Sequence, residues 1–524
     1  MKKYWVAVCV AMVGLLAIGL SSWAADPQVG GTLVMAIQSS PPSIDWMTSH
    51  SAASRYIGFH IFEGLTTFNE GFEVIPQLAS SWESNEDFTV WTFHLREGIS
   101  FHDGSDMTAA DVLASYERFM NVSPRKGDFA GIVDEVLALD DYTVQFVCSA
   151  PSRIPTILAL PNPAMYIIPE RLKDVGATEL AAEDLVGTGP FRVLEWVPDI
   201  ELRLGRFEAY VPSPFPMSGI GGARVPYVDE VLMKIVPESG TRVAGLETGE
   251  YDIIEGVPLS DVARLSGDEQ FKVVKGVLPK WWPALVINTL QPPLDDLRLR
   301  QAVLAALCAD EIMAVVGNNL PEYYRVDPSI FMAPSSWYSD IGSRMGLYNQ
   351  CDTAKVAQLL ADAGYDGEPV VLVTNSTYDS MYKASLVAAQ QLQKAGFNVK
   401  IEIYDWPGSG DIIFRGDGTG WNIGVTGHTP RFDAAQFYRP FYSANKPNGG
   451  FADDVIDALI EQDMVTIGFE DRYEIWEDIQ ARIYEIGAPE IKLGDYFQVH
   501  ATQANINGYY PWYGIAAWNV WIDE

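Results

Sequence analysis

One stretch, Lys280–Arg300, limits most strongly what this chain can fold into. Within it, Ala284–Asn288 has the length and apolar character of a strand, and a Pro-Pro pair ends that strand because proline cannot donate to a sheet ladder. Asp295 or Asp296 can then cap a helix whose apolar side chains recur on one stripe. A strand that runs through Pro-Pro into a new helix predicts a crossing between two lobes. We therefore predict a hinge at Ala284–Asn288, with the two preceding tryptophans at the mouth of the interlobe space.

Strand–helix–strand patterns lie on both sides of this stretch, as expected for two α/β lobes. The first pattern joins Val231–Val236 to Asp252–Glu255 through a short helix capped by Thr241. The second pattern consists of Val370–Thr374, Asp379–Ala395 and Asn398–Tyr404.

A mixed subdomain is predicted between about residues 50 and 180. Thr108 and Asp111 form a capping box for a helix, and the apolar patterns that follow predict antiparallel strands at Val133–Leu139 and Thr143–Val147. The last strands, near 496–500 and 515–521, are expected to return to the first lobe.

The first 24 residues have the pattern of an export signal. Lys2 and Lys3 form a basic end, Val6–Leu20 is apolar, and a small-x-small sequence predicts cleavage after Ala24. An uncleaved membrane anchor is the alternative, but the apolar run is shorter than the roughly 20 residues that a spanning helix needs. We expect an exported, periplasmic protein.

Charge and size restrict the partners of the exported chain. About 500 residues remain after cleavage, enough for two or three domains. Loss of two lysines takes the formal net charge from −34 to about −36. Nucleic acid and anionic membrane would both repel such a chain, so neither is an expected partner.

Three cysteines remain outside the signal: Cys148, Cys308 and Cys351. An odd number allows at most one disulfide. Cys308 and Cys351 are the better candidates in an oxidising compartment, and three buried thiols are the equal alternative.

Sequence motifs for catalysis and for nucleotide or metal binding are missing from the chain. It contains no G-x-S-x-G, Walker-type loop, H-E-x-x-H or C-x-x-C, and its six histidines lack metal-ligand spacing. We therefore predict no enzyme activity, metal or cofactor. An exported peptidase built on dispersed residues is the competing class.

Aromatic and polar residues instead suggest a binding site. Tryptophans 281, 282, 406 and 421 stand at the ends of predicted strands, where ligands bind at the meeting of two α/β lobes. Core packing is the alternative for about half of them. A loop after a predicted strand carries His428, Arg431 and Asp433. His428 suits a metal or haem, but a lone loop histidine more often only hydrogen-bonds.

Several ordered sequence blocks resemble the family 5 extracellular solute-binding proteins, the dipeptide, oligopeptide and nickel receptors of ABC importers. The likeness covers essentially the whole chain after the signal. Its blocks are Pro76–Trp82, Phe93–Gly98, Phe101–Gly104, Thr108–Val112, Gly187–Pro190, Asn288–Thr289, Asp296–Ala302, Ala354–Leu360 and Ala363–Tyr365.

The resemblance implies an α/β fold of the periplasmic-binding-protein type II, with two lobes, an extra subdomain and a two-strand hinge. It assigns residues 25–285 to the first lobe, with the subdomain inserted at about 50–180. Residues 286–497 then form the second lobe, and 498–524 return to the first, with Tyr496–Thr502 as the second crossing. Such a protein performs no chemistry. It is usually monomeric, closes on its solute and docks on a membrane permease driven by a cytoplasmic ATPase.

The ligand class follows less directly from the resemblance. In peptide-binding relatives an aspartate grips the α-ammonium of the peptide, and here that place falls on Pro430. Arg431 beside it suggests a carboxylate or other anion, because guanidinium pairs with carboxylate through two hydrogen bonds. Ala435 occupies the place of the histidine in nickel-binding relatives, which disfavours nickel. Some relatives take opines or oligosaccharides in place of peptides, and the tryptophans would suit stacking on sugars.

These arguments give one set of predicted ligand-binding residues. Arg431 is the charged anchor, the tryptophans are pocket walls, and serine, histidine and aspartate side chains are polar contacts. The set is Ser39, Ser40, Trp281, Trp282, Trp406, Trp421, His428, Arg431 and Asp433.

Overall fold

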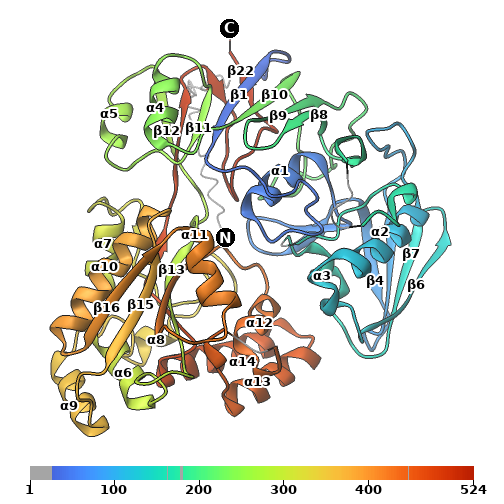
Figure 1. The fold of residues 1–524 in the computed structure, drawn as a ribbon. Helices are drawn as coiled ribbons and strands as arrows, with labels where there is room; N and C mark the ends of the chain where they lie inside the picture. Colours follow the sequence, from blue (N-terminus) through green and yellow to red (C-terminus); the bar gives the residue numbers. More distant parts are fainter. Residues whose placement is uncertain (1–25, 162, 177–180, 446–447, 524) are drawn as a thin grey trace, which may run out of the picture.

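The computed structural model describes residues 26–161, 163–176, 181–445 and 448–523. The predicted signal and its cleavage point lie outside these residues. Figure 1 shows a first lobe at the top, a second lobe in yellow and orange below it, and a smaller subdomain in blue and cyan on the right. No helix among the described residues is both long and apolar enough to cross a bilayer.

A seven-stranded mixed sheet forms the first lobe, in the order β12-β20-β11-β1-β10-β9-β8. Its strands are β1 (Thr32–Ile37), β8 (Phe191–Val197), β9 (Glu201–Arg206), β10 (Glu230–Ile235), β11 (Ile253–Glu255), β12 (Phe271–Lys275) and β20 (Val499–Gln503). Its helices are α1 (Ala52–Ile61), α4 (Ser239–Glu247) and α5 (Val262–Ser266). Strands β10 and β11 both pair in parallel with β1, and α4 connects them, so the predicted βαβ unit is confirmed. The predicted Thr241 cap is wrong, because the N-cap of α4 is Glu238, three residues earlier, and Thr241 lies inside the helix.

The inserted subdomain contains a four-stranded antiparallel sheet in the order β4-β5-β7-β6. Its elements are β4 (Ala79–Ser84), β5 (Val90–Leu95), α2 (Ala109–Val122), β6 (Val133–Asp140), β7 (Thr143–Cys148) and α3 (Ile154–Ala159). The predicted capping box at the start of α2 is present, and the Thr108 backbone N–H donates to Asp111 Oδ2 over 2.8 Å. The subdomain is thus fixed by local signals that the sequence carries.

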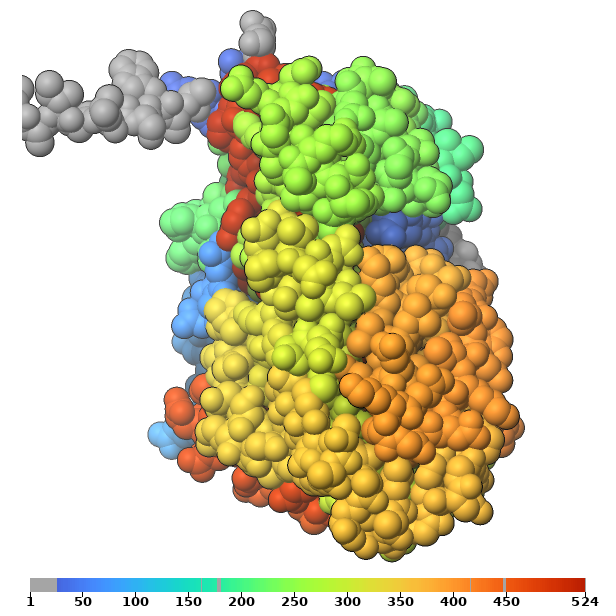
Figure 2. Space-filling view, turned by 90° about the vertical axis from the view of Figure 1, so that its left-hand side faces the viewer, coloured from blue at the N-terminus to red at the C-terminus, as the bar shows by residue number. Residues whose placement is uncertain are grey.

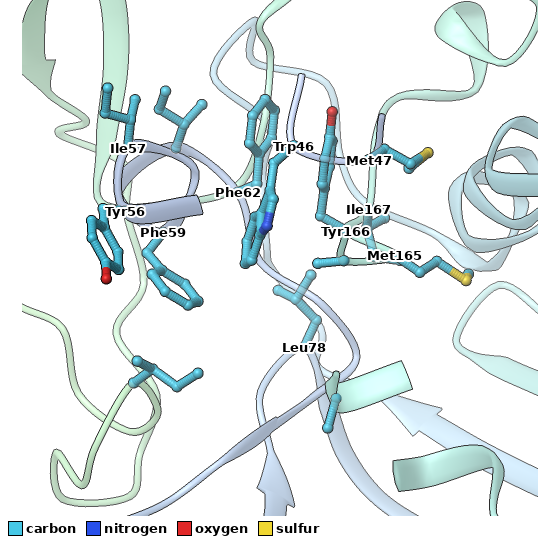
Figure 3. Packing of buried hydrophobic residues seen from close by; sticks show 14 of the residues in the cluster. Trp46, Met47, Tyr56, Ile57, Phe59, Phe62, Leu78, Met165, Tyr166 and Ile167 are labelled. Carbon is cyan, nitrogen blue, oxygen red and sulfur yellow. The ribbon is translucent and has the colours of Figure 1, made fainter. Parts of the chain in front are cut away.

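An aromatic core joins this subdomain to α1 of the first lobe (Figure 3). The ring centroids of Phe62 and Tyr166 stack 3.9 Å apart, and Trp46 meets Phe59 edge-on at 4.7 Å. The Tyr166 hydroxyl donates to Asp45 over 2.6 Å, so its polar end is satisfied inside the core. Since a buried aromatic ring contributes roughly 1.5–3 kcal/mol, we expect the subdomain and first lobe to form one unit.

The second lobe has a five-stranded sheet in the order β16-β15-β17-β13-β18. Its strands are β13 (Trp282–Ile287), β15 (Pro369–Asn375), β16 (Asn398–Tyr404), β17 (Ile423–His428) and β18 (Glu490–Lys492). Its helices are α6 (Leu297–Ala306), α7 (Ala309–Val316), α8 (Ile341–Arg344), α9 (Thr353–Ala363), α10 (Asp379–Lys394), α11 (Trp406–Gly410), α12 (Tyr438–Phe441), α13 (Asp454–Val465) and α14 (Phe469–Ile486). Three short strand pairs lie outside these sheets: β2 (Thr66–Phe68) with β3 (Val74–Pro76), β14 (Tyr324–Arg325) with β19 (Asp495–Tyr496), and β21 (Ile506–Asn507) with β22 (Trp521–Ile522).

The predicted position of the hinge is wrong. The apolar run Ala284–Asn288 belongs mostly to β13, which is paired on one side by β17 and on the other by β18 inside the second sheet. The chain crosses earlier, at residues 276–281 between β12 and β13, and returns at 493–498 between β18 and β20. A continuous apolar run is typical of a strand that is buried on both faces. Ala284–Asn288 belongs mostly to such a strand inside the second sheet, and the crossing lies in the residues before it.

A disulfide joins Cys308 to Cys351 in the second lobe, with the two Cα atoms 4.9 Å apart. It links the start of α7 to the segment before α9. The sequence leaves open a disulfide or three free thiols, and the structure has the disulfide, with Cys148 as a buried thiol.

Candidate ligand-binding cleft

The two crossing segments pair with each other at the boundary between the lobes. The Lys280 backbone N–H donates to the carbonyl of Tyr496 over 2.8 Å, and the Tyr496 N–H donates to the carbonyl of Trp281 over 3.0 Å. The two segments therefore form the expected two-strand hinge. Figure 2 shows the second lobe packed directly beneath the green part of the first lobe.

A buried ion pair holds the first crossing against the first lobe. Lys280 Nζ lies 2.7 Å from the Glu255 carboxylate, and both side chains are less than a tenth exposed. The backbone N–H of Gln38 donates to the same carboxylate over 3.0 Å. Burial raises the pKa of Glu255, but the Lys280 ammonium outweighs burial and lowers that pKa to about 2. The pair is thus fully ionised and fixes Lys280 at the base of the cleft.

A small cavity of about 60 Å³ lies beside this ion pair and takes its walls from both lobes. Ser39 and Tyr56 come from the first lobe, Lys280 and Trp281 from the crossing, and Tyr378 from the second lobe. Because the walls come from separate bodies, a solute held here would contact both lobes only when they are closed.

Aromatic rings continue from the cavity into the second lobe. The Tyr378 ring lies 5.0 Å from the Trp281 ring and 5.5 Å from the Trp406 ring. The Trp281 indole N–H donates to Ser380 Oγ over 2.9 Å, which fixes its ring plane. Of the predicted residues, the structure thus brings Ser39 and Trp281 into the cavity wall and Trp406 next to it.

Two predicted tryptophans lie in the hydrophobic core and not in the cleft. Trp282 is 0 % exposed and Trp421 is 1 % exposed. Successive strand residues point to opposite faces, so Trp282 faces the core although its neighbour Trp281 faces the cleft. Trp421 precedes β17, whose first residue pairs with the last residue of β13, so Trp421 lies at the end of the sheet away from His428. We withdraw both residues as pocket walls.

Asp433 and Ser40 are occupied by contacts within the protein. The Asp433 carboxylate accepts both Nη groups of Arg472, over 2.9 and 3.0 Å. Burial raises the pKa of Asp433, but the Arg472 guanidinium outweighs burial and lowers that pKa to about 2. Ser40 Oγ accepts the backbone N–H of Asp199 over 3.1 Å. Both side chains therefore make hydrogen bonds that stabilise the fold.

His428 is the last residue of β17, directly before the loop that carries Arg431. Its Nε2 is 3.0 Å from Glu490 Oε2, and its ring lies 4.4 Å from the Trp282 ring. Among the described residues, no group of three or more His, Cys, Asp or Glu side chains is placed to hold a metal ion. A contact with Glu490 is the role that the structure gives this histidine.

Arg431 lies in the loop where the second lobe touches the first. The Pro430 carbonyl accepts the Tyr513 hydroxyl over 3.4 Å, and the Phe432 ring packs 4.8 Å from the Tyr513 ring. The Arg431 guanidinium lies 5.6 Å from the Phe437 ring, and its buried Nε has no hydrogen-bond partner among the described residues. Burial lowers the pKa of this guanidinium below its usual value, against the opposing charges of Tyr513 and Glu490.

Further cationic residues surround this loop. The Arg55 guanidinium of α1 lies 4.6 Å from the Tyr513 ring and is buried. Burial, followed by the charges of Arg439, Arg125, Arg431 and Arg55, lowers the pKa of His50 to about 4. On a chain of net charge −34, this is a local concentration of positive charge.

Sequence reasoning missed several of these residues. Arg55 and Tyr56 lie on the helix after the first strand, and an arginine within that mostly apolar helix was a usable signal. Lys280 begins the stretch that constrains the fold most strongly, yet its partner Glu255 could not be foreseen from spacing. Tyr378 reaches the cavity only because α10 begins beside Trp281.

Comparisons with known proteins agree with this architecture. Residues 73–449 match the family described as bacterial extracellular solute-binding proteins, family 5 Middle. A probable peptide ABC transporter periplasmic-binding protein, y4tO of Sinorhizobium fredii, is 26 % identical over 88 % of this chain and 88 % of its own. The glutathione-binding protein GsiB of Pectobacterium atrosepticum is 26 % identical over 97 % and 96 % of the two chains. The solved structure of AgaA from A. tumefacien R10 with agropinic acid is 25 % identical, with a TM-score of 0.76, covering 94 % of this chain and 99 % of that chain.

Proposed function

Because this chain belongs to the bacterial extracellular solute-binding proteins of family 5, we propose that it is the substrate-binding component of an ABC importer. It captures a peptide or similar small organic solute in the interlobe cleft and delivers it to a membrane permease with its ATPase. The observation that carries this proposal is the two-lobed fold with a two-strand hinge, and the small cavity at the crossing, with walls from both lobes and from the hinge, supports the position of the cleft. A solute that contacts both lobes shifts the equilibrium toward the closed form, which is the form a permease can distinguish.

We further propose that the solute carries a carboxylate or another anionic group. The buried Arg431 Nε, which has no hydrogen-bond partner among the described residues, supports this, as do Arg55 and Arg439 nearby. A buried donor without a partner is costly, and an anion in the cleft would satisfy it. The related structure that holds agropinic acid and the relative named for glutathione fit this class. A peptide is our first candidate and an opine the second.

The remaining features of the proposal follow from the family. We propose a periplasmic monomer, exported with cleavage after Ala24, that binds its solute without turnover and needs no cofactor. The lobe boundaries are part of the same proposal, with the first one moved from residue 285 to the crossing at 276–281, because β13 lies in the second sheet, and the second one kept near residue 497. Intact mass of the exported protein tests the cleavage, and light scattering tests the monomer.

A ligand screen tests the function. The mature protein, refolded to remove bound solute, would be screened by thermal shift against peptides, opines, oligosaccharides, nickel and haem. A solute that binds the folded protein raises the melting temperature by mass action. We expect a concentration-dependent rise with one anionic class and recovery of that solute unchanged. Conversion of the solute to product would favour the exported-peptidase alternative.

Arg431→Ala tests the anchor. We expect affinity for the carboxylated solute to fall by at least about tenfold, the loss of roughly one charge-assisted hydrogen bond. Arg264→Ala is the matched control, because Arg264 is half-exposed and bonds Asp261 on the outer side of the first lobe. Unchanged affinity in Arg431→Ala would remove this residue from the site.

A further inference from the structure

A second and larger cavity, of about 300 Å³, opens between the inserted subdomain and the second lobe. It shares no lining residue with the small cavity at the crossing. Among the elements labelled in Figure 1, β4, α3 and α14 supply residues to its lining. Aromatic rings dominate its walls: Phe68, Phe72, Trp82 and Trp91 from the subdomain side, and Trp337 and Phe469 from the second lobe.

The rings at the base of this cavity are held in place by other rings. Phe432 of the second lobe packs 5.1 Å from Phe68 and 5.3 Å from Phe72 of the first. On the opposite wall, Trp337 meets Phe469 edge-on at 4.8 Å. The aromatic surface therefore includes ring contacts between the two lobes, and part of it would be lost if the lobes moved apart.

The charged residues of the cavity are already engaged. Arg472 donates to Asp433 over 2.9 and 3.0 Å and to Asp463 over 2.8 Å. Arg153 donates to the Asp463 carbonyl over 3.0 Å and to the Tyr438 hydroxyl over 3.3 Å. With these cations bonded to protein groups, the cavity presents mainly ring faces to an occupant, and an ion would find no uncompensated opposite charge among its described lining residues.

We propose that this cavity is a second binding site, for a neutral planar aromatic molecule. Its volume is at the lower end of the range of small-molecule sites, which suits one or two fused rings and not a long chain. Aromatic walls on both sides favour offset or edge-to-face contact with such a ring. Because the walls belong to two bodies, the occupant stabilises the closed form and so raises affinity at the interlobe cleft by linkage.

The test uses indole as the probe. Its binding to the mature protein is measured by isothermal titration calorimetry and by ligand-observed NMR. We expect saturable binding, weakened at least fivefold by Phe469→Ala and at least tenfold by Ser336→Trp, which places a ring in the cavity. Phe469 is 39 % exposed and Ser336 is exposed, so neither change empties the core. Phe215→Ala is the matched control, because Phe215 is 45 % exposed and lies outside the cavity lining.

Three results would overturn the proposal. They are indole binding that does not saturate, an unchanged indole affinity in Ser336→Trp, and a higher affinity for indole-3-acetate than for indole. Arg431→Ala separates this site from the transport proposal. Indole binding should persist in that variant whatever happens to the anionic solute, and its loss would place indole in the interlobe cleft and refute a separate site.

Discussion

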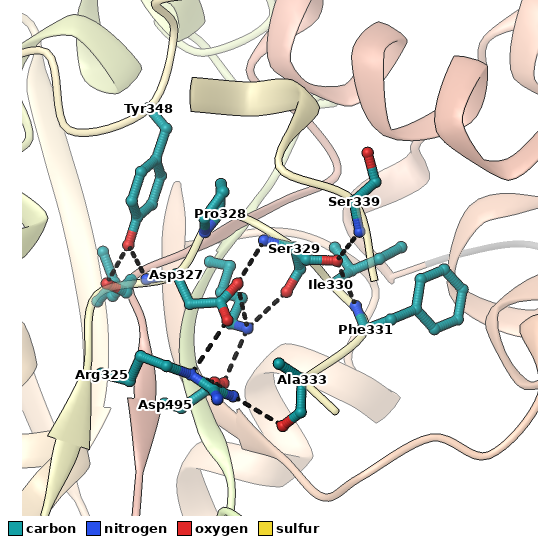
Figure 4. Close-up of polar contacts among 12 residues, drawn as sticks. Arg325, Asp327, Pro328, Ser329, Ile330, Phe331, Ala333, Ser339, Tyr348 and Asp495 are labelled. Carbon is teal, nitrogen blue, oxygen red and sulfur yellow. Dashed lines mark hydrogen bonds and ion pairs between the residues drawn. The ribbon is translucent and has the colours of Figure 1, made fainter. Parts of the chain in front are cut away.

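Two buried cationic regions of the second lobe differ in how their charges are compensated. Near the second crossing, the Lys492 side chain is 0 % exposed, and its Nζ lies 2.8 Å from Asp495 and 3.5 Å from Asp327. Figure 4 shows Asp327 and Asp495 bridged by Arg325, with Ser329 alongside. Each charge there has an opposite charge beside it.

The Arg431 loop is built in the opposite way. Arg431 has the ring of Phe437 beside it and feels the Glu490 carboxylate and other arginines, but its Nε has no hydrogen-bond partner among the described residues. A buried cation that is paired within the protein supports the fold, whereas one with an unpartnered donor is available for a ligand. The following predictions test this difference, from the largest expected effect on stability to the smallest.

Lys492→Met breaks the compensated cluster. It leaves the Asp327 and Asp495 carboxylates buried with one cation fewer, so we expect the free energy of unfolding to fall by about 3–5 kcal/mol. Urea denaturation measures this change. Lys383→Met is the matched control, because Lys383 pairs with a largely exposed Asp379 at the surface. The control should lose no more than about 1 kcal/mol. Equal losses in the two variants would show that the buried cluster is not specially stabilising.

Glu255→Gln breaks the ion pair at the hinge. The pH dependence of the unfolding free energy then shows whether the ionised carboxylate stabilises the fold. The folded pKa of Glu255 is about 2, below the ordinary value of 4.5. Its stabilising contribution, up to about 3 kcal/mol, is therefore present above pH 4.5 and lost as the pH falls toward 2. We expect the difference in unfolding free energy between the parent and Glu255→Gln to be larger at about pH 7 than at about pH 3. A difference independent of pH would contradict a carboxylate stabilised by Lys280.

Local signals in the sequence were sufficient for many elements of the fold. The alternating pattern at 398–404 gave β16 its observed bounds, and the Thr108 capping box gave α2 its start. The hinge lies a few residues before its predicted position, because an apolar run indicates burial without indicating which sheet buries it. The crossing is defined by hydrogen bonds between Lys280 and Tyr496, which are far apart in sequence.

The candidate site was less accessible to sequence reasoning. Trp281 and Trp282 are adjacent and chemically identical, yet one lines the cavity and the other is core, and only strand register separates them. Arg431 was singled out because it stands beside the place of a family aspartate. Its cationic neighbour Arg55 belongs to a helix hundreds of residues earlier, so the positive charge around the Arg431 loop emerges only in three dimensions.

Arg431→Met gives the smallest expected change in stability and the sharpest contrast with Lys492→Met. Removing a buried donor that lacks a hydrogen-bond partner among the described residues should leave the unfolding free energy of the ligand-free protein unchanged or raise it by up to about 1 kcal/mol. The same variant should lose most of the thermal shift given by the anionic solute. The gain in unfolding free energy without ligand and the loss of thermal shift with ligand have one cause. Arg431 binds the ligand at the expense of the stability of the ligand-free protein. A ligand-free variant destabilised by more than about 1 kcal/mol would instead place Arg431 with Lys492, as a residue that supports the fold.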